Sequence, residues 1–338
     1  METSNLLLNI SNLCKRMILM TENIQLNKHI KAENKIIYVQ NEKLFPNRFM
    51  CKQVEKYVSD NKFYKVIYDT KLFNISLYFV NSPKDREIQD IIRYIINIAL
   101  IVSTLSSFRT PIKITIIFTP FKKQINYGEN KLLDVCNINS GVSIKYDCVL
   151  IWREEEWKFI LIHELVHCYG LDDILLPHYS VNEVTNYITT NYKISGPVLP
   201  AEAFDDAIST IIYVCYFNLN IKDIIKKLHG EVCYSIHQIS KLFKHITVND
   251  INQLNKKSLN NVVLKQQSDV FSYFILKTAL LFEYELFCNY VITKNKNKYA
   301  SKMVVYVLNN KRFINVLNKH TQNIMLKTVS PSMKRISN

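Results

Sequence analysis

The chain has 338 residues, of which 48% are hydrophobic, 21% charged and 12% aromatic, with only 5 Gly and 8 Pro. This composition is that of a globular protein and excludes a collagen-like, low-complexity or intrinsically disordered chain. The formal net charge is +14, but the lysines are scattered rather than gathered in one block. A Lys-, Asn- and Ile-rich composition explains this charge as well as a nucleic-acid surface does, and binding to polyanions would then be incidental.

The cysteines and the apolar runs indicate in which cellular compartment the protein is expected and whether it spans a membrane. The eight cysteines lie far apart with no C-x-x-C pair, which predicts free thiols and a reducing compartment such as the cytoplasm. The N-terminus lacks the charged and apolar regions of a secretory signal. The longest apolar run, 91–105, contains Arg93 and Asn97 and is shorter than a bilayer requires, so we expect a buried helix and no membrane span.

The first 170 residues predict an α/β lobe behind an N-terminal extension. Residues 1–60 give weak signals for one amphipathic helix followed by a loop and a short strand. From 61 to 170, β-branched and aromatic runs alternate with one long apolar helix that begins at Ser82-Pro83 and ends near Ser107. The predicted strands are Tyr64–Tyr68, Leu72–Val80, Ile112–Thr119 and Val142–Trp152.

An H-E-x-x-H motif lies in the next apolar segment. The acidic residues 154–156, which follow Arg153, favour a helix N-terminus, and Gly170 is a suitable residue to end that helix. On a helix, His163 and His167 are one turn apart on the same face, so both imidazoles can reach one metal ion. Glu164 lies beside them, where a carboxylate can act on a metal-activated water. Three such groups in a core-facing helix would be costly without a metal or a partner.

The rest of the chain predicts a mainly helical lobe over 171–326. Leu171–Leu199 is polar and broken by Pro and Gly, which indicates a long inserted loop or a small subdomain. Pro200 then begins a helix of about eighteen residues over Ala201–Asn218, and a further apolar helix is expected over Val270–Val291. The basic tail at 327–338 is expected to be disordered.

A catalytic zinc needs a third protein ligand, and two residues compete for this role. Asp173 follows the motif at the spacing of the extended metzincin pattern, with Asp in place of His, but no Met-turn follows at a suitable distance. Glu202 lies on the next helix, with Asp206 one turn later. Carboxylates at i and i+4 share a helix face, so Glu202 can coordinate while Asp206 fixes the tautomer of His163. We favour Glu202 and keep Asp173 as the alternative.

Together, the H-E-x-x-H motif and the Glu202-x-x-x-Asp206 pair resemble the gluzincin family of zinc peptidases. The stretch from Asn137 to Ala207 is also similar to predicted metallopeptidases of large DNA viruses. The resemblance implies a zincin-like α+β fold, with a small mixed sheet and the motif helix in an N-terminal lobe and a mainly helical C-terminal lobe. It implies Zn²⁺ as cofactor, a polypeptide substrate, and a location in the host cytoplasm or the virion. The connection from His167 to Glu202 is longer than in the gluzincin thermolysin.

These features predict a zinc endopeptidase in which Glu164 is the general base and the strand Val142–Trp152 binds an extended peptide by its edge. Four residues are candidates to stabilise the oxyanion: Tyr187, Tyr192, Tyr234 and His237. Two other hypotheses stay open. The chain can be an inactive zincin-like protein that serves as a binding or virion structural component, or a basic nucleic-acid-binding protein with a chance motif.

Overall fold

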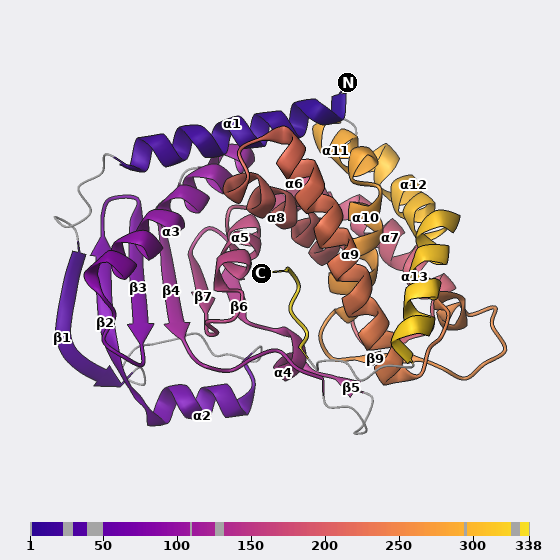
Figure 1. The fold of residues 1–338 in the computed structure, drawn as a ribbon, viewed down its shortest axis with the longest axis horizontal. Helices are drawn as coiled ribbons and strands as arrows, with labels where there is room; N and C mark the ends of the chain where they lie inside the picture. Colours follow the sequence, from indigo (N-terminus) through magenta and orange to yellow (C-terminus); the bar gives the residue numbers. More distant parts are fainter. Residues whose placement is uncertain are drawn as a thin grey trace. The chain divides into compact units, whose positions relative to one another are not determined.

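The structure is a computed structural model, which describes residues 2–22, 30–38, 50–108, 110–125, 132–293, 296–325 and 332–337. The chain divides into two compact units (Figure 1). Unit 1 comprises Met1–Ser11, Lys123–Ile138 and Asp172–Asn338, and unit 2 comprises Asn12–Lys122 and Asn139–Leu171. Each unit has its own sheet and its own buried core. The predicted α+β class is confirmed.

Unit 2 is built on a six-stranded mixed sheet. In spatial order its strands are β1 (Ile30–Tyr38), β2 (Lys62–Asp69), β3 (Phe73–Phe79), β4 (Ile112–Phe118), β7 (Cys148–Ile151) and β6 (Gly141–Ile144). The pairs β3/β4 and β4/β7 are parallel, whereas β1/β2, β2/β3 and β6/β7 are antiparallel. β6 is therefore an edge strand that runs antiparallel to its neighbour.

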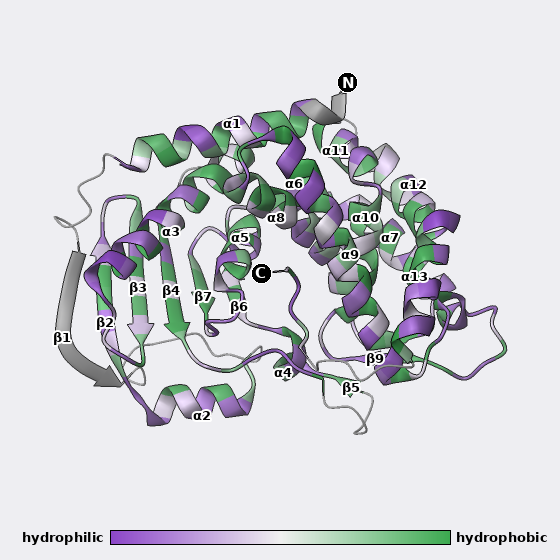
Figure 2. Cartoon of the chain, viewed as in Figure 1, coloured by the Kyte–Doolittle hydropathy of each residue, from purple (hydrophilic) through white to green (hydrophobic). Residues whose placement is uncertain are grey.

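Strand β7 and the hairpin that contains it show why the sheet forms here. All four residues of β7 are buried, as expected for a strand covered on both faces, and Figure 2 shows β4 and β7 as mostly hydrophobic. The single strand predicted over Val142–Trp152 is wrong, because the chain turns at 145–147. Tyr146 adopts a left-handed φ of 61°, donates its N–H to the Cys168 carbonyl at 2.7 Å and stacks on Phe108. Tertiary contacts therefore fix this turn.

The helices of unit 2 pack on the sheet or on one another. They are α2 (Lys52–Asp60), α3 (Asp85–Ser106), α5 (Trp157–Cys168) and the second half of α1 (Glu2–Glu22). α5 packs on β6 and β7, and α3 packs alongside α5. Asn97, the polar residue of the apolar run, accepts a hydrogen bond from the Thr21 hydroxyl at 2.6 Å.

Helix α3 is the one helix in the described residues that is long and apolar enough, by length and composition, to cross a membrane. Of its most apolar window, 61% is buried inside the protein. Core helices of soluble proteins pass the same test, and the burial agrees with the interpretation of residues 91–105 as a buried helix.

Unit 1 is mainly helical, with a small sheet in the order β5, β9, β8. Its strands are β5 (Leu132–Leu133), β8 (Ile194–Ser195) and β9 (Leu264–Gln266). Its helical segments are α4 (Val135–Ile138), α6 (Leu171–Leu175), α7 (His178–Asn191), α8 (Pro200–Phe217), α9 (Ile221–Ile246), η3 (Ile251–Leu254), the π-helical η4 (Phe271–Leu276), α10 (Lys277–Phe282), α11 (Tyr284–Ile292), α12 (Lys296–Leu308) and α13 (Lys311–Met325). α8 is central, with contacts to α7, α9, α10 and η4.

The segment Leu171–Leu199 is not the long loop that its composition predicts. It forms α6, α7 and β8. Pro177 precedes the first turn of α7, and Val184 and Ile188, one helical turn apart, are fully buried in a helix that packs against α8 and α12. Similarly, the single helix expected over Val270–Val291 is interrupted at Glu283, where ψ is 45°. Tertiary packing overrides a weak local pattern in the first case.

The C-terminal tail is a second correction. The sequence predicts disorder over 327–338, yet residues 332–337 are packed against unit 1. Arg335 donates from Nη1 to Oδ1 of Asp206 at 3.0 Å, and Lys277 donates to the Arg335 carbonyl at 2.7 Å. Met333 and Ile336 are buried. The basic tail packs here because Arg335 forms an ion pair with the buried Asp206. Residues 326–331 and 338 lie outside the described residues.

The N-terminal residues 1–60 are not a separate extension where the structure describes them. β1 forms the outer strand of the unit 2 sheet, and α2 contacts β1. The weak strand signal predicted between Asn27 and Lys43 corresponds to β1; residues 23–29 and 39–49 lie outside the described residues. The predicted change of lobe after residue 170 lies next to the division between Leu171 and Asp172.

Candidate metal centre

The residues that flank the motif helix α5 at its two ends, Glu156 and Gly170, have positive φ angles. Glu156, directly before the helix, has a left-handed φ of 61°, so the acidic residues 154–156 precede the helix rather than forming its first turn. At the other end Gly170 has φ 68°, and a Cβ there would approach the Tyr146 hydroxyl to 2.6 Å. Gly is therefore required at this position. Almost every side chain of the helix is buried.

The two motif histidines face each other within this helix. Nε2 of His163 and Nε2 of His167 lie 3.3 Å apart, with the ring planes at 82°. Two Zn–N bonds of about 2.0–2.1 Å at a tetrahedral angle place the nitrogens about 3.3 Å apart. His163 is 2% exposed and His167 is half-buried. The spacing of the two nitrogens therefore fits a zinc ion, and His167 is the more exposed of the two rings.

Glu164 is held against the edge strand β6. Its side chain is buried, and Oε2 accepts a hydrogen bond from the Ser143 hydroxyl at 3.0 Å. A Cβ on Gly141 would lie 2.8 Å from both Cγ and Oε1 of Glu164, so only glycine leaves room for this carboxylate. The sequence analysis missed Gly141 and Ser143. The available signal was two small residues, two apart, at the start of a strand adjoining the motif.

Glu202 lies in the first turn of α8 in unit 1, after Pro200, and is half-buried. Asp269 anchors the chain before this helix, because its Oδ2 accepts the Leu199 N–H at 2.6 Å. Burial, and to a smaller extent the negative charge of Glu202, raises the pKa of Asp269 to about 7. Asp269 is thus a buried acid near the predicted ligand that no local sequence pattern revealed.

Asp206, predicted to orient His163, is fully buried on α8 and forms the ion pair with Arg335 described above. The Arg335 guanidinium also lies 4.6 Å from the centroid of the Tyr273 ring. One carboxylate oxygen of Asp206 is therefore committed to the tail. The contact of Asp206 with His163 would join the two units and stays a prediction.

Asp173, the alternative third ligand, is exposed and lies 4.0 Å from the His178 imidazole. Its neighbour Asp172 is half-buried and has a carboxylate oxygen within 4.8 Å of the fully buried Asp205. The exposure of Asp173 disfavours it as a ligand. Asp205, adjacent to Asp206 on α8, is a buried acid that the sequence analysis did not single out.

The four candidates for oxyanion stabilisation all lie in unit 1. The Tyr187 hydroxyl accepts from Asn309 at 2.7 Å, and the Tyr234 hydroxyl accepts from Gln238 at 2.6 Å. Tyr192 is buried, and burial raises the pKa of its hydroxyl. Nδ1 of His237 lies 3.3 Å from Nε2 of His320. Each candidate is thus buried or in contact with another residue of unit 1. A catalytic role for any of them stays a prediction.

Unit 2 brings together His163, Glu164 and His167, whereas Glu202, Asp206 and Asp173 belong to unit 1. The complete ligand set is therefore a prediction that spans the two units. No protein-family model, curated protein or solved structure matches the chain.

Proposed function

We propose that this chain is a zinc-dependent endopeptidase of the zincin type, with His163 and His167 as two of the zinc ligands. The observation that carries this proposal is the 3.3 Å separation of the two Nε2 atoms on a buried helix, with the Glu164 carboxylate next to them. A chance H-E-x-x-H motif has no reason to combine facing imidazoles with a glycine and a serine that accommodate the glutamate. The eight free thiols are compatible with the proposed reducing compartment.

Zinc bound at this pair would supply a water of lowered pKa and polarise the scissile carbonyl. The chain's own groups carry the proton chemistry. Glu164 accepts the proton of the attacking water and delivers it to the leaving amine. Ser143 holds Oε2 of this carboxylate in place. The burial of Glu164 excludes bulk water from this transfer.

The edge strand β6 provides a binding mode for the substrate. Its free edge offers backbone N–H and C=O groups to an extended peptide, and it carries Gly141 and Ser143, which contact Glu164. A peptide added to this edge would therefore lie next to the general base. This arrangement is the reason to propose a polypeptide substrate.

For the third ligand we propose Glu202 rather than Asp173. Glu202 is half-buried on α8, a helix in which most residues are buried, and Asp269 fixes the start of that helix. Asp173 is exposed beside His178. Under this proposal Asp206 lies one turn from Glu202 and contributes through the position of His163.

The proposal is tested with the full chain and Glu164→Gln. Gln keeps the size of the side chain but cannot accept the proton, so we expect zinc to stay bound and the cleavage of a mixed peptide library to be lost. Glu155→Gln, in the segment before the helix, is the matched control and should cleave as the wild type does. Equal cleavage by wild type and Glu164→Gln would remove the peptidase proposal and leave a zincin-like binding protein.

A second pair of variants decides the third ligand. Glu202→Gln is expected to weaken zinc binding by roughly 100-fold or more, because a carboxylate ligand is lost, whereas Asp173→Asn should leave it unchanged. Competition with a fluorescent chelator measures both affinities. The opposite result would assign the third ligand to Asp173.

A further inference from the structure

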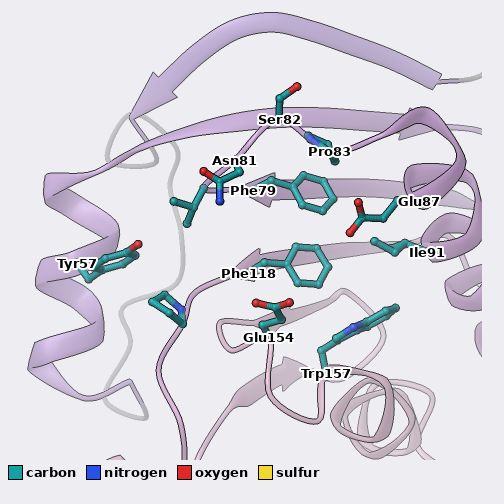
Figure 3. A pocket seen from close by; sticks show the side chains of 12 residues that line it. Tyr57, Phe79, Asn81, Ser82, Pro83, Glu87, Ile91, Phe118, Glu154 and Trp157 are labelled. Atoms are coloured by element: carbon teal, nitrogen blue, oxygen red, sulfur yellow. The ribbon is translucent and has the colours of Figure 1, made fainter.

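A second hollow in unit 2 lies apart from the motif histidines, at the carboxyl ends of two parallel strands. Phe79 ends β3 and Phe118 ends β4, and the two residues are register partners. The hollow has a volume of about 320 Å³ and is lined by Tyr57, Phe79, Val80, Asn81, Ser82, Pro83, Glu87, Ile91, Phe118, Pro120, Glu154 and Trp157. We call it the aromatic pocket (Figure 3). Open α/β sheets commonly bind ligands at this end of their strands.

Four aromatic rings shape the aromatic pocket. Phe79 stacks on Phe118 with a centroid separation of 4.8 Å and an interplanar angle of 18°. Trp157 meets Phe118 edge-on at 5.7 Å and 90°, and Tyr57 faces the hollow from α2 (Figure 3). Rings from four separate elements therefore surround one small space. The rings lie next to the hollow, and the negative faces of π-systems attract cations.

The charge of the lining has one sign. Among the twelve described residues that line the aromatic pocket, the charged side chains are Glu87 and Glu154, and both are exposed. Figure 3 shows Glu154 beside the Phe118 ring and Glu87 directed in from α3. An acidic hollow is unexpected in a chain whose net charge is +14. The basic side chains Lys84, Arg86 and Lys158 line an adjoining hollow, which shares Glu87, Ile91 and Trp157 with the aromatic pocket.

We propose that the aromatic pocket binds an alkylammonium group. Aromatic faces and carboxylates together select an organic cation with an apolar surface over a neutral or anionic ligand. The volume is at the lower end of that of ligand pockets, roughly 300–1,000 Å³, so the occupant is a single small head group. Trp157 is 9% exposed, and Lys158 Nζ lies 5.9 Å from its ring centroid, within the distance at which a cation interacts with an aromatic face. The proposal is independent of the zinc chemistry.

The cation can be a free small molecule or the side chain of a lysine or methylated lysine in a bound polypeptide. Both share the alkylammonium head, and two probes distinguish them. Free choline represents the small molecule, and a short peptide with a central trimethyl-lysine represents the side chain. The neutral probe 3,3-dimethyl-1-butanol has the shape of choline without its charge.

Binding is measured with the full chain by isothermal titration calorimetry and by quenching of Trp157 fluorescence, with Trp157→Phe to assign the signal. We expect saturable 1:1 binding of choline or of the peptide, and binding of the neutral alcohol weaker by roughly tenfold or more. The double variant Glu87→Gln/Glu154→Gln should weaken binding of the cation by roughly tenfold. Glu55→Gln/Asp85→Asn removes the same charge from exposed sites of unit 2 outside the aromatic pocket and should bind as the wild type does.

The tighter of the two cationic probes identifies the source of the natural ligand. Equal affinity for choline and its neutral isostere would overturn the proposal, because the pocket would then be merely apolar. No saturable binding of either cationic probe would overturn it as well. All four substituted carboxylates are exposed, so loss of folding does not obscure the result, and thermal unfolding of each variant verifies this.

Discussion

Two pairs of histidines in this chain have facing ring nitrogens at the same distance of 3.3 Å: His163 with His167 in unit 2, and His237 with His320 in unit 1. The first pair lies on one helix beside Glu164, whose carboxylate is held by Ser143. The second joins α9 and α13, and no third metal-ligating group accompanies it among the described residues. The separation of two imidazoles therefore does not define a metal centre by itself.

The charges next to the second pair also differ in sign. Burial, the positive charge of Lys241 and the neighbouring His320 all lower the pKa of His237. Lys241 itself hydrogen-bonds the Ser332 carbonyl of the C-terminal tail. A cation beside the second pair disfavours a metal ion there, whereas a carboxylate beside the first pair favours one. The comparison teaches that the neighbouring charges separate a candidate catalytic pair from a structural pair.

The largest expected effect is on catalysis. His167→Ala removes a proposed zinc ligand and should lower the cleavage rate by roughly 10³-fold or more. His320→Ala alters the second pair in the same way and should retain the activity within about threefold. A peptide-library assay on both variants makes the comparison. Equal loss of activity in the two variants would contradict the assignment of the first pair alone to the metal.

A substitution in the C-terminal tail tests whether the ion pair between Arg335 and Asp206 stabilises unit 1. Arg335→Met leaves the Asp206 carboxylate buried without its counter-charge, which should lower the free energy of unfolding by about 3–5 kcal/mol. Denaturant titration measures this change. The double variant Asp206→Asn/Arg335→Met should recover much of the loss, since neither charge is then buried. An unchanged free energy in Arg335→Met would show that the tail does not stabilise this unit.

Two glycines give a smaller and more specific contrast. Gly141→Ala would place a Cβ 2.8 Å from the Glu164 side chain, so we expect a displaced base and a rate reduced by roughly 100-fold, with zinc retained. Gly230 lies on α9, the helix of His237, and nothing lies within 4 Å of a Cβ there. Gly230→Ala should stabilise the helix by about 0.5–1 kcal/mol without affecting the rate. Wild-type kinetics in Gly141→Ala would contradict the proposed position of Glu164.

The smallest effect is the pH dependence of stability at the second pair. The folded pKa of His237 is below its usual value, so the unfolded chain binds the proton more readily. The stability is therefore present above about pH 6.5 and is lost as the pH falls through the folded pKa. His237→Ala should reduce this pH dependence of the free energy of unfolding. It is measured by denaturant titration in buffers about one pH unit apart, between about pH 5 and pH 8. An identical pH dependence in the variant would show that His237 does not contribute.

The sequence predicts the geometry of α5 well because the motif is local: a spacing of four residues on an apolar helix determines that His163 and His167 face each other. The long helix α3 and the helix that begins at Pro200 were predictable for the same reason, since their apolar periodicity and their first residues are local signals. The α+β class followed from the alternation of such segments.

What the sequence does not predict depends on tertiary contacts. Ser143 and Gly141 matter because β6 packs on α5, and no local pattern relates them to Glu164. The Tyr146 turn splits an apparent strand because its backbone bonds to Cys168. The tail is ordered because Arg335 meets Asp206, which is distant along the chain. Asp269 is similarly defined by its bond to Leu199.

The most direct test of the account is the zinc content of the purified full chain after passage over a chelating resin, measured by mass spectrometry for the wild type and two double variants. The wild type and His237→Ala/His320→Ala should each retain about one zinc ion per chain, and His163→Ala/His167→Ala should retain none. A wild type without zinc, or equal zinc in both double variants, would contradict the assignment of the metal centre to the α5 histidines.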